Sequence, residues 1–181
     1  MYKNFLKPKS MATMALLVAI NIVLSRFLGF KAGPFNFSLA FIPTCIASMT
    51  LGPLGGAVTA ALADLIRSLL FPQGTYFPLF TVSQFLYGFG YGLMLYNKKL
   101  SAVKLSVLVT IQYIILNIFV GSFWYYLYAI IILNEPKAFV PLMASRTFAA
   151  LVNIPVHIIG INIITKYLYP PLSEFSKKLA E

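Results

Sequence analysis

Long apolar runs alternate with short polar segments along the whole chain. A helix needs about 20 mostly apolar residues to cross the hydrocarbon core of a bilayer. Apolar runs predict six spans within a single domain that covers residues 1–181, at about 11–30, 36–49, 54–71, 79–96, 105–133 and 139–169. The second of these is short, and the last two exceed the minimum length, as expected of helices that tilt or extend beyond the lipid. The predicted fold class is therefore an all-α membrane protein in which six transmembrane helices form one bundle.

The breaks between these runs contain residues that end helices. Leu51-Gly52-Pro53 predicts a tight turn between the second and third spans, because proline cannot continue a helix and glycine permits a sharp bend. Segments 29–34, 72–78 and 134–137 also interrupt the helical pattern. An even number of spans places both termini on the same side of the membrane.

Composition supports the membrane assignment and explains the charge. The chain is 60% hydrophobic and 10% charged, against about 45–50% and about 25% in soluble domains. The net charge of +10 suits nucleic-acid binding, but too little polar surface remains for such an interface.

The lysines instead predict the orientation of the chain in the membrane, because cytoplasmic loops are rich in basic residues. Lys31 and Lys137 lie on one side, whereas nine lie on the side of the termini: Lys3, Lys7, Lys9, Lys98, Lys99, Lys104, Lys166, Lys177 and Lys178.

This distribution predicts cytoplasmic termini in a multi-pass protein of the cell membrane. The three arginines follow a different pattern from the lysines. Arg26, Arg67 and Arg146 lie within apolar spans or at their outer margins, where a charge costs at least about 2.5–3.5 kcal/mol at the helix centre. Arg26, close to its helix end, could extend toward the head groups. The others are expected to face a hydrated cavity in the outer half of the membrane.

Other polar and aromatic residues are expected at the same depth. Three sets share helix faces, namely Gln84, Tyr87 and Tyr91, then Asn117, Trp124 and Tyr128, and finally Arg146, Asn153 and His157. Together they predict a pocket that opens to the outside. Two alternatives stay open: Asp64 and Arg67, three residues apart, could neutralise each other, and the amides could join helices by hydrogen bonds.

The residue types in this pocket favour one class of ligand. Guanidinium groups bind carboxylates in pairs of hydrogen bonds, and aromatic faces stack on flat rings. A planar ring that carries carboxylates would satisfy both. One cysteine, Cys45, excludes a disulfide framework, and one histidine, His157, argues against a metal centre.

The sequence contains no catalytic triad spacing, no paired carboxylates and no phosphate-binding glycine loop. We therefore expect a protein that is not an enzyme and has no cofactor of its own. Any movement driven by ATP would need partner subunits.

The first span also carries a candidate docking face. Ala15 and Ala19 are four residues apart, with Ala12 nearby, and small residues at this spacing let another helix approach closely. Packing within the bundle would explain the same spacing.

Six spans in a chain of this length, with small residues four apart in the first helix, are similar to the S component of an energy-coupling factor (ECF) vitamin transporter. The segments that resemble the folate-specific family are 24–28, 42–43, 51–57, Asp64, 70–74, 76–78 and Thr81. The resemblance implies folate binding from outside, followed by association with a membrane coupling subunit and two cytoplasmic ATPase subunits. It also assigns Ala15 and Ala19 to the contact with the coupling subunit, and segments 29–34 and 72–78 to outer gate loops.

Folate suits the chemistry of the predicted pocket. Its glutamate tail offers two carboxylates for the arginines, and its pterin edge offers N–H donors that Asp64 could accept. If Asp64 pairs with Arg67, Gln84 or Asn117 would recognise the pterin instead. Aromatic rings at Trp124, Phe77 or Tyr87 could stack on the ligand. The complete set of candidate ligand-binding residues is Arg26, Asp64, Arg67, Phe77, Gln84, Tyr87, Asn117, Trp124 and Arg146.

Alternative functions come from other classes of protein. An S component for riboflavin, thiamine or a pyridoxine-like ring would leave the arginines without an evident purpose. An integral membrane enzyme would need nucleophiles and acid–base pairs, which are scarce in this sequence. An inverted repeat in the hydropathy pattern would favour a self-sufficient carrier, but the sequence shows none.

Overall fold

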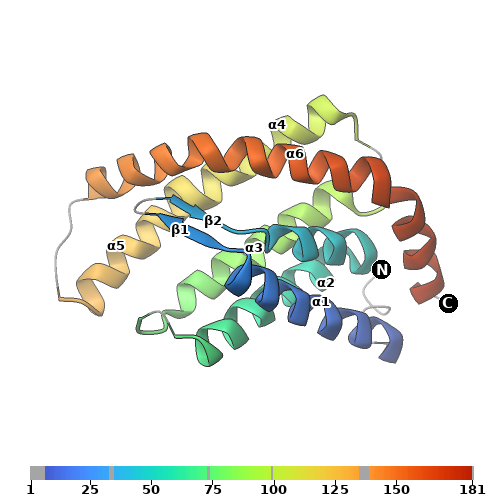
Figure 1. Cartoon of the computed structure of the whole chain (residues 1–181), viewed down its shortest axis with the longest axis horizontal. Coiled ribbons are helices and arrows are strands. Elements are labelled where there is room, and N and C mark those ends of the chain that lie inside the picture. Colours follow the sequence, from blue (N-terminus) through green and yellow to red (C-terminus); the bar gives the residue numbers. More distant parts are fainter. Residues whose placement is uncertain (1–6, 33–34, 73, 99, 135–138, 181) are drawn as a thin grey trace.

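The computed structural model describes residues 7–32, 35–72, 74–98, 100–134 and 139–180, which form a bundle of helices with one short hairpin (Figure 1). The elements in chain order are α1 (Pro8–Phe27), β1 (Phe30–Ala32), β2 (Phe35–Phe37), α2 (Phe41–Leu70), α3 (Pro78–Leu95), α4 (Ala102–Tyr113), the π-helix η1 (Ile114–Val120), α5 (Gly121–Ile131) and α6 (Phe139–Ala180). Within the described residues, four helical stretches are long and apolar enough to cross a membrane: Pro8–Phe27, Phe41–Leu70, Ala102–Ile131 and Phe139–Leu172.

The segment before α2 differs from the sequence prediction. A helix is predicted from residue 36, but β1 and β2 pair there as an antiparallel hairpin, with Phe30 opposite Phe37 and Lys31 opposite Asn36. Aromatic residues favour extended backbone, and this local preference outweighs the apolar pattern. Helix α2 therefore starts only at Phe41.

Helix α2 is bent back on itself at the predicted turn. Gly52 has φ 79° and ψ −174°, which is not helical, and Pro53 follows it. The two arms then run side by side, since a Cβ placed on Gly56 would lie 2.8 Å from the Cα of Ser48. Helix α3 packs against both arms: the Ser48 hydroxyl donates to the Gly88 carbonyl at 2.9 Å. This close packing of small residues forms one wall of the bundle.

The last helix is longer than predicted. It continues past residue 169 to Ala180 and includes Pro170 and Pro171, and Figure 1 shows its C-terminal part turning away from the main axis. The Ser176 hydroxyl donates to the backbone carbonyl of Thr50 at 2.9 Å, next to the break in α2. This contact stabilises the extension and supplies a partner to a carbonyl close to the interrupted helix.

The start of α1 and the end of α6 lie at the same end of the bundle (Figure 1). Lys3, Lys99 and Lys137, which contribute to the predicted orientation, lie outside the described residues, as do residues 33, 34, 73, 135 and 136 of the predicted breaks. The opposite end carries the hairpin, the end of α2 and the start of α3.

Candidate ligand-binding cavity

A cavity of about 210 Å³ lies among α1, α2, α3, the α4–η1 segment and α6. Five of the candidate residues line it: Asp64, Arg67, Gln84, Tyr87 and Asn117. Its wall combines the Asp64–Arg67 ion pair and aromatic rings with four carboxamides, from Asn21, Gln84, Asn117 and Asn153. This mixture can bind a ligand that has both a flat ring and polar edges.

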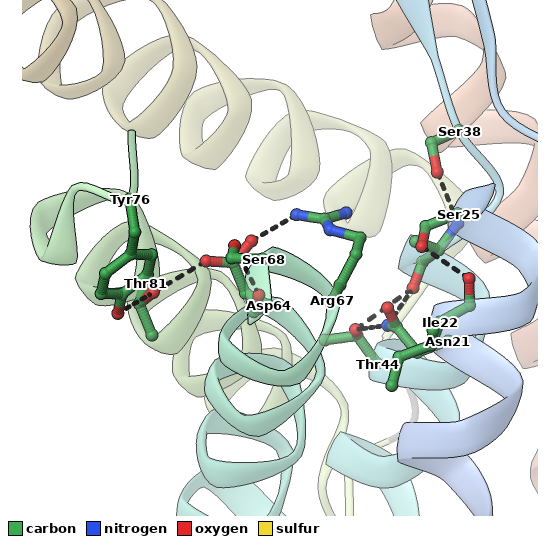
Figure 2. Close-up of polar contacts among 11 residues, drawn as sticks. Asn21, Ile22, Ser25, Ser38, Thr44, Asp64, Arg67, Ser68, Tyr76 and Thr81 are labelled. Carbon is green, nitrogen blue, oxygen red and sulfur yellow. Dashed lines mark hydrogen bonds and ion pairs between the residues drawn. The ribbon is translucent and has the colours of Figure 1, made fainter. Parts of the chain in front are cut away.

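Asp64 and Arg67 form an ion pair on α2 (Figure 2). The second carboxylate oxygen, Oδ2 of Asp64, accepts a hydrogen bond of 2.8 Å from the Thr81 hydroxyl on α3. The Asp64 backbone carbonyl also accepts from the Ser68 hydroxyl at 2.8 Å. Each Asp64 carboxylate oxygen thus has a partner within the protein, as expected if Asp64 and Arg67 neutralise each other.

Asn117 reaches the cavity from the π-helix η1. Its Oδ1 accepts a long hydrogen bond of 3.4 Å from Nη1 of Arg146 on α6. The Arg146 guanidinium also lies over the Tyr125 ring, 5.6 Å from its centre. Close approach is possible because residue 121 is glycine, where a Cβ would lie 2.9 Å from Nη1. Arg146 is thus held beside a residue that lines the cavity.

Aromatic rings surround His157 at another part of the cavity wall. Its ring stacks on Phe41, with centres 4.2 Å apart and planes at 24°, and meets the edge of Tyr113 at 5.2 Å. The Tyr91 hydroxyl lies 3.2 Å from Nδ1 of His157. The histidine is a hydrogen-bonded interior residue within an aromatic wall.

Four polar lining residues were not singled out from the sequence: Asn21, Ser38, Thr44 and Tyr113. Nδ2 of Asn21 on α1 donates to the Ala40 carbonyl at 2.8 Å and to the Thr44 hydroxyl at 3.0 Å (Figure 2). Asn21 is buried, and both it and Thr44 line the cavity. An amide in the middle of an apolar span was the signal that could have identified Asn21, since such residues rarely face lipid.

Three candidates lie elsewhere. Arg26 is exposed and its guanidinium lies 5.4 Å from the centre of the Phe71 ring. Phe77 packs edge-on against Phe80, and Trp124 packs against Phe123 with ring centres 5.3 Å apart. None of Arg26, Phe77 and Trp124 is among the described residues that line the cavity.

The small residues of α1 are on its outer surface. Ala15 and Ala19 are exposed, whereas Met14, Leu17 and Val18 are buried against the bundle. The stripe is therefore accessible to lipid or to a partner helix.

Comparison with known proteins gives consistent matches over most of the chain. The family model for the ECF transporter, substrate-specific component, matches residues 9–168. The folate transporter FolT of Clostridium novyi (strain NT) is 30% identical over 155 residues, which cover 86% of this chain and 87% of that protein. FolT of Leuconostoc mesenteroides subsp. mesenteroides is 29% identical over 120 residues, or 66% of this chain and 64% of that protein.

Two solved structures share the fold. A crystal structure of FolT bound with folic acid superposes with a TM-score of 0.72 at 30% identity and covers 84% of this chain and 88% of that chain. The S component of a bacterial ECF transporter gives a TM-score of 0.54 at 26% identity, with coverage of 92% and 96%.

Proposed function

Since this chain belongs to the family of ECF transporter substrate-specific components, we propose that it binds folate from the extracellular side and delivers it across the membrane. The observation that carries the proposal is the polar and aromatic cavity, in a chain whose fold is similar to that of FolT bound with folic acid. The family is a transporter component, which agrees with the expectation that the chain is not an enzyme.

The proposed contacts follow from the cavity wall. Arg67 and Arg146 are the cations available to the glutamate carboxylates. Because Asp64 pairs with Arg67, the carboxamide of Gln84, which has both donors and an acceptor, recognises the pterin edge. Tyr87 stacks on the ring. Arg26, Phe77 and Trp124 lie away from the cavity and have no part in this arrangement.

The proposed topology has six spans with both termini in the cytoplasm of a bacterium. The two arms of α2 count separately, and the first arm, 11 residues at 1.5 Å each, is roughly 16 Å long. The β1–β2 hairpin completes this short crossing on the outer side. The lysines near the termini fit the cytoplasmic side of such a bundle.

The proposed partners are a membrane coupling subunit, which docks on α1 at Ala15 and Ala19, and two ATPase subunits that hydrolyse ATP. Their involvement is supported by family membership and by the exposure of these alanines. The chain itself is proposed to use no cofactor and to bind no nucleic acid.

A calorimetric titration of the purified protein with folic acid, riboflavin, thiamine and pyridoxine tests the ligand. Heat is the better signal than tryptophan fluorescence, because Trp124 lies away from the cavity. Saturable binding of folic acid alone is the expected result. Binding of another vitamin in its place would support an S component of different specificity and overturn the folate assignment.

A further inference from the structure

A directed chain of hydrogen bonds joins Asp64 in the cavity wall to Tyr76 in the segment between α2 and α3 (Figure 2). The Thr81 hydroxyl donates to Oδ2 of Asp64 at 2.8 Å and lies 2.9 Å from the Tyr76 hydroxyl. A hydroxyl has one proton and a carboxylate only accepts, so Thr81 gives its proton to Asp64. Tyr76 must then be the donor to Thr81, and all the donors point toward the carboxylate.

The chain ends at a residue that faces the ligand space. Oδ1 of Asp64 accepts from Nη2 of Arg67, and both residues line the cavity. Thr81 and Tyr76 are not among its lining residues, and Tyr76 is 36% exposed. Two residues outside the cavity, Thr81 directly and Tyr76 through Thr81, are therefore hydrogen-bonded to a carboxylate in the cavity wall.

The geometry points to a role for this chain in selecting an anionic ligand. We propose that Thr81 and Tyr76 are positioning residues that hold Asp64 in single contact with Arg67, so that the remaining N–H donors of Arg67 bind a carboxylate of the ligand. This inference rests on the proposed folate function and names the residues that make its site selective for anions.

The physical reason is the competition between two carboxylates for one guanidinium. Arg67 has five N–H donors and can pair with a carboxylate through two of them. Within the described part of the chain, Arg67 donates to Asp64 through Nη2. If Oδ2 of Asp64 lost its bond to Thr81, the carboxylate would be free to turn and take a second donor. Arg67 would then be neutralised more completely and would attract the ligand carboxylate less.

The test compares two ligands that differ in charge and hardly in size: folic acid and its diamide, in which both glutamate carboxylates are converted to carboxamides. Thr81→Val removes the hydroxyl with little change in shape. We expect it to weaken folic acid binding about tenfold, the range of one charge-assisted hydrogen bond, and to change binding of the diamide less than about twofold. A purely structural role would weaken both ligands equally.

Three further variants separate the role of the chain from damage to the fold. Thr81→Ser retains the hydroxyl and should bind both ligands as the wild type does. Ser83→Ala removes a buried hydroxyl from the same helix that bonds only to the Leu79 carbonyl at 3.4 Å, and it should have no effect. Tyr76→Phe, at a partly exposed position, should weaken folic acid alone by about threefold, because it removes the far donor of the chain.

The outcomes are distinct. Selective loss of folic acid affinity in Thr81→Val, or in Tyr76→Phe if the valine variant does not fold, supports the inference. Equal loss for both ligands, or no loss with folic acid, overturns it and leaves the proposed function standing. No saturable binding of folic acid by the wild-type protein would overturn the proposed function and this inference with it.

Discussion

Arg67 and Arg146 have different surroundings, so removing each of them should affect ligand binding differently. Arg67 is paired with Asp64 on its own helix, whereas Arg146 has a long bond to Asn117 and a ring contact with Tyr125. Among the described residues no carboxylate forms an ion pair with Arg146, so its positive charge is the less neutralised of the two.

Arg146→Ala should weaken folate binding by at least about 1.5 kcal/mol, the lower range for a hydrogen bond to a charged group. The charge that would attract a ligand carboxylate is lost, while Asn117 remains in the cavity wall. Isothermal titration of wild type and variant measures the difference. Arg26→Ala is the matched control, because Arg26 is exposed and contacts Phe71 instead of the cavity. Unchanged affinity in Arg146→Ala would contradict the prediction.

Elements that are determined by a few neighbouring residues could be predicted from the sequence. The turn in α2 follows from Gly52 and Pro53, which enforce a break wherever they occur in an apolar run. The grouping of Gln84, Tyr87 and Tyr91 on α3 follows from helical spacing, and all three line the cavity. These parts of the fold and of the site depend only on neighbours a few residues away.

The π-helix explains where the same reasoning fails. Helical spacing places Asn117, Trp124 and Tyr128 on one face, but η1 widens seven residues between Ile114 and Val120 and shifts the phase of everything after it. Asn117 lines the cavity, whereas Trp124 packs against Phe123 and Tyr128 packs against Phe77. No residue type in η1 signals this shift, because the wider turn is set by packing between helices.

Insertion of one alanine after Phe119 should therefore rotate α5 by about 100°, one residue of helical phase, because η1 is already widened and does not absorb a further residue. Gly121 would move away from Arg146, and a larger side chain would take its place beside the guanidinium. We expect folate affinity to fall at least about tenfold while the protein stays folded, in line with the loss of a charge-assisted contact. Phe119→Ala keeps the length of the helix at an exposed position and should bind normally. Equal binding by the insertion variant would show that the phase of α5 is unimportant.

The contact between α2 and α3 gives a second prediction for an element. A Cβ on Gly88 would lie 2.2 Å from the Gly56 carbonyl oxygen, so Gly88→Ala must push two backbones apart. Overpacking of this kind costs about 1–3 kcal/mol, and Tm in detergent should fall by several degrees. Gly90→Ala is the control on the same helix: its Cβ would meet the Gln112 side chain at 2.6 Å, and turning that side chain aside gives up one hydrogen bond to the Tyr87 carbonyl but moves no backbone. A Tm for Gly88→Ala equal to that of Gly90→Ala would contradict the argument.

For the molecule as a whole, the cavity and the small-residue stripe of α1 are separate surfaces. The cavity lies inside the bundle, whereas the small-residue stripe of α1 faces outward from it. The start of α1 lies at the same end of the molecule as the end of α6 (Figure 1). A partner that binds along α1 can therefore act on the whole bundle without touching the ligand.

Replacement of both Ala15 and Ala19 by leucine should abolish ATP-dependent folate uptake and leave folate binding unchanged. Both alanines are exposed, so the leucines do not disturb the buried face of α1, but they prevent the close approach of another helix. Uptake is measured in cells or vesicles that contain the complete transporter, and binding is measured by calorimetry on the purified chain. Ala144→Leu, at an exposed position on α6, adds the same bulk to a different face and should transport normally. Uptake at the wild-type rate by the double variant would exclude α1 as the docking surface, whereas loss of binding together with uptake would place the alanines in the fold instead of the interface.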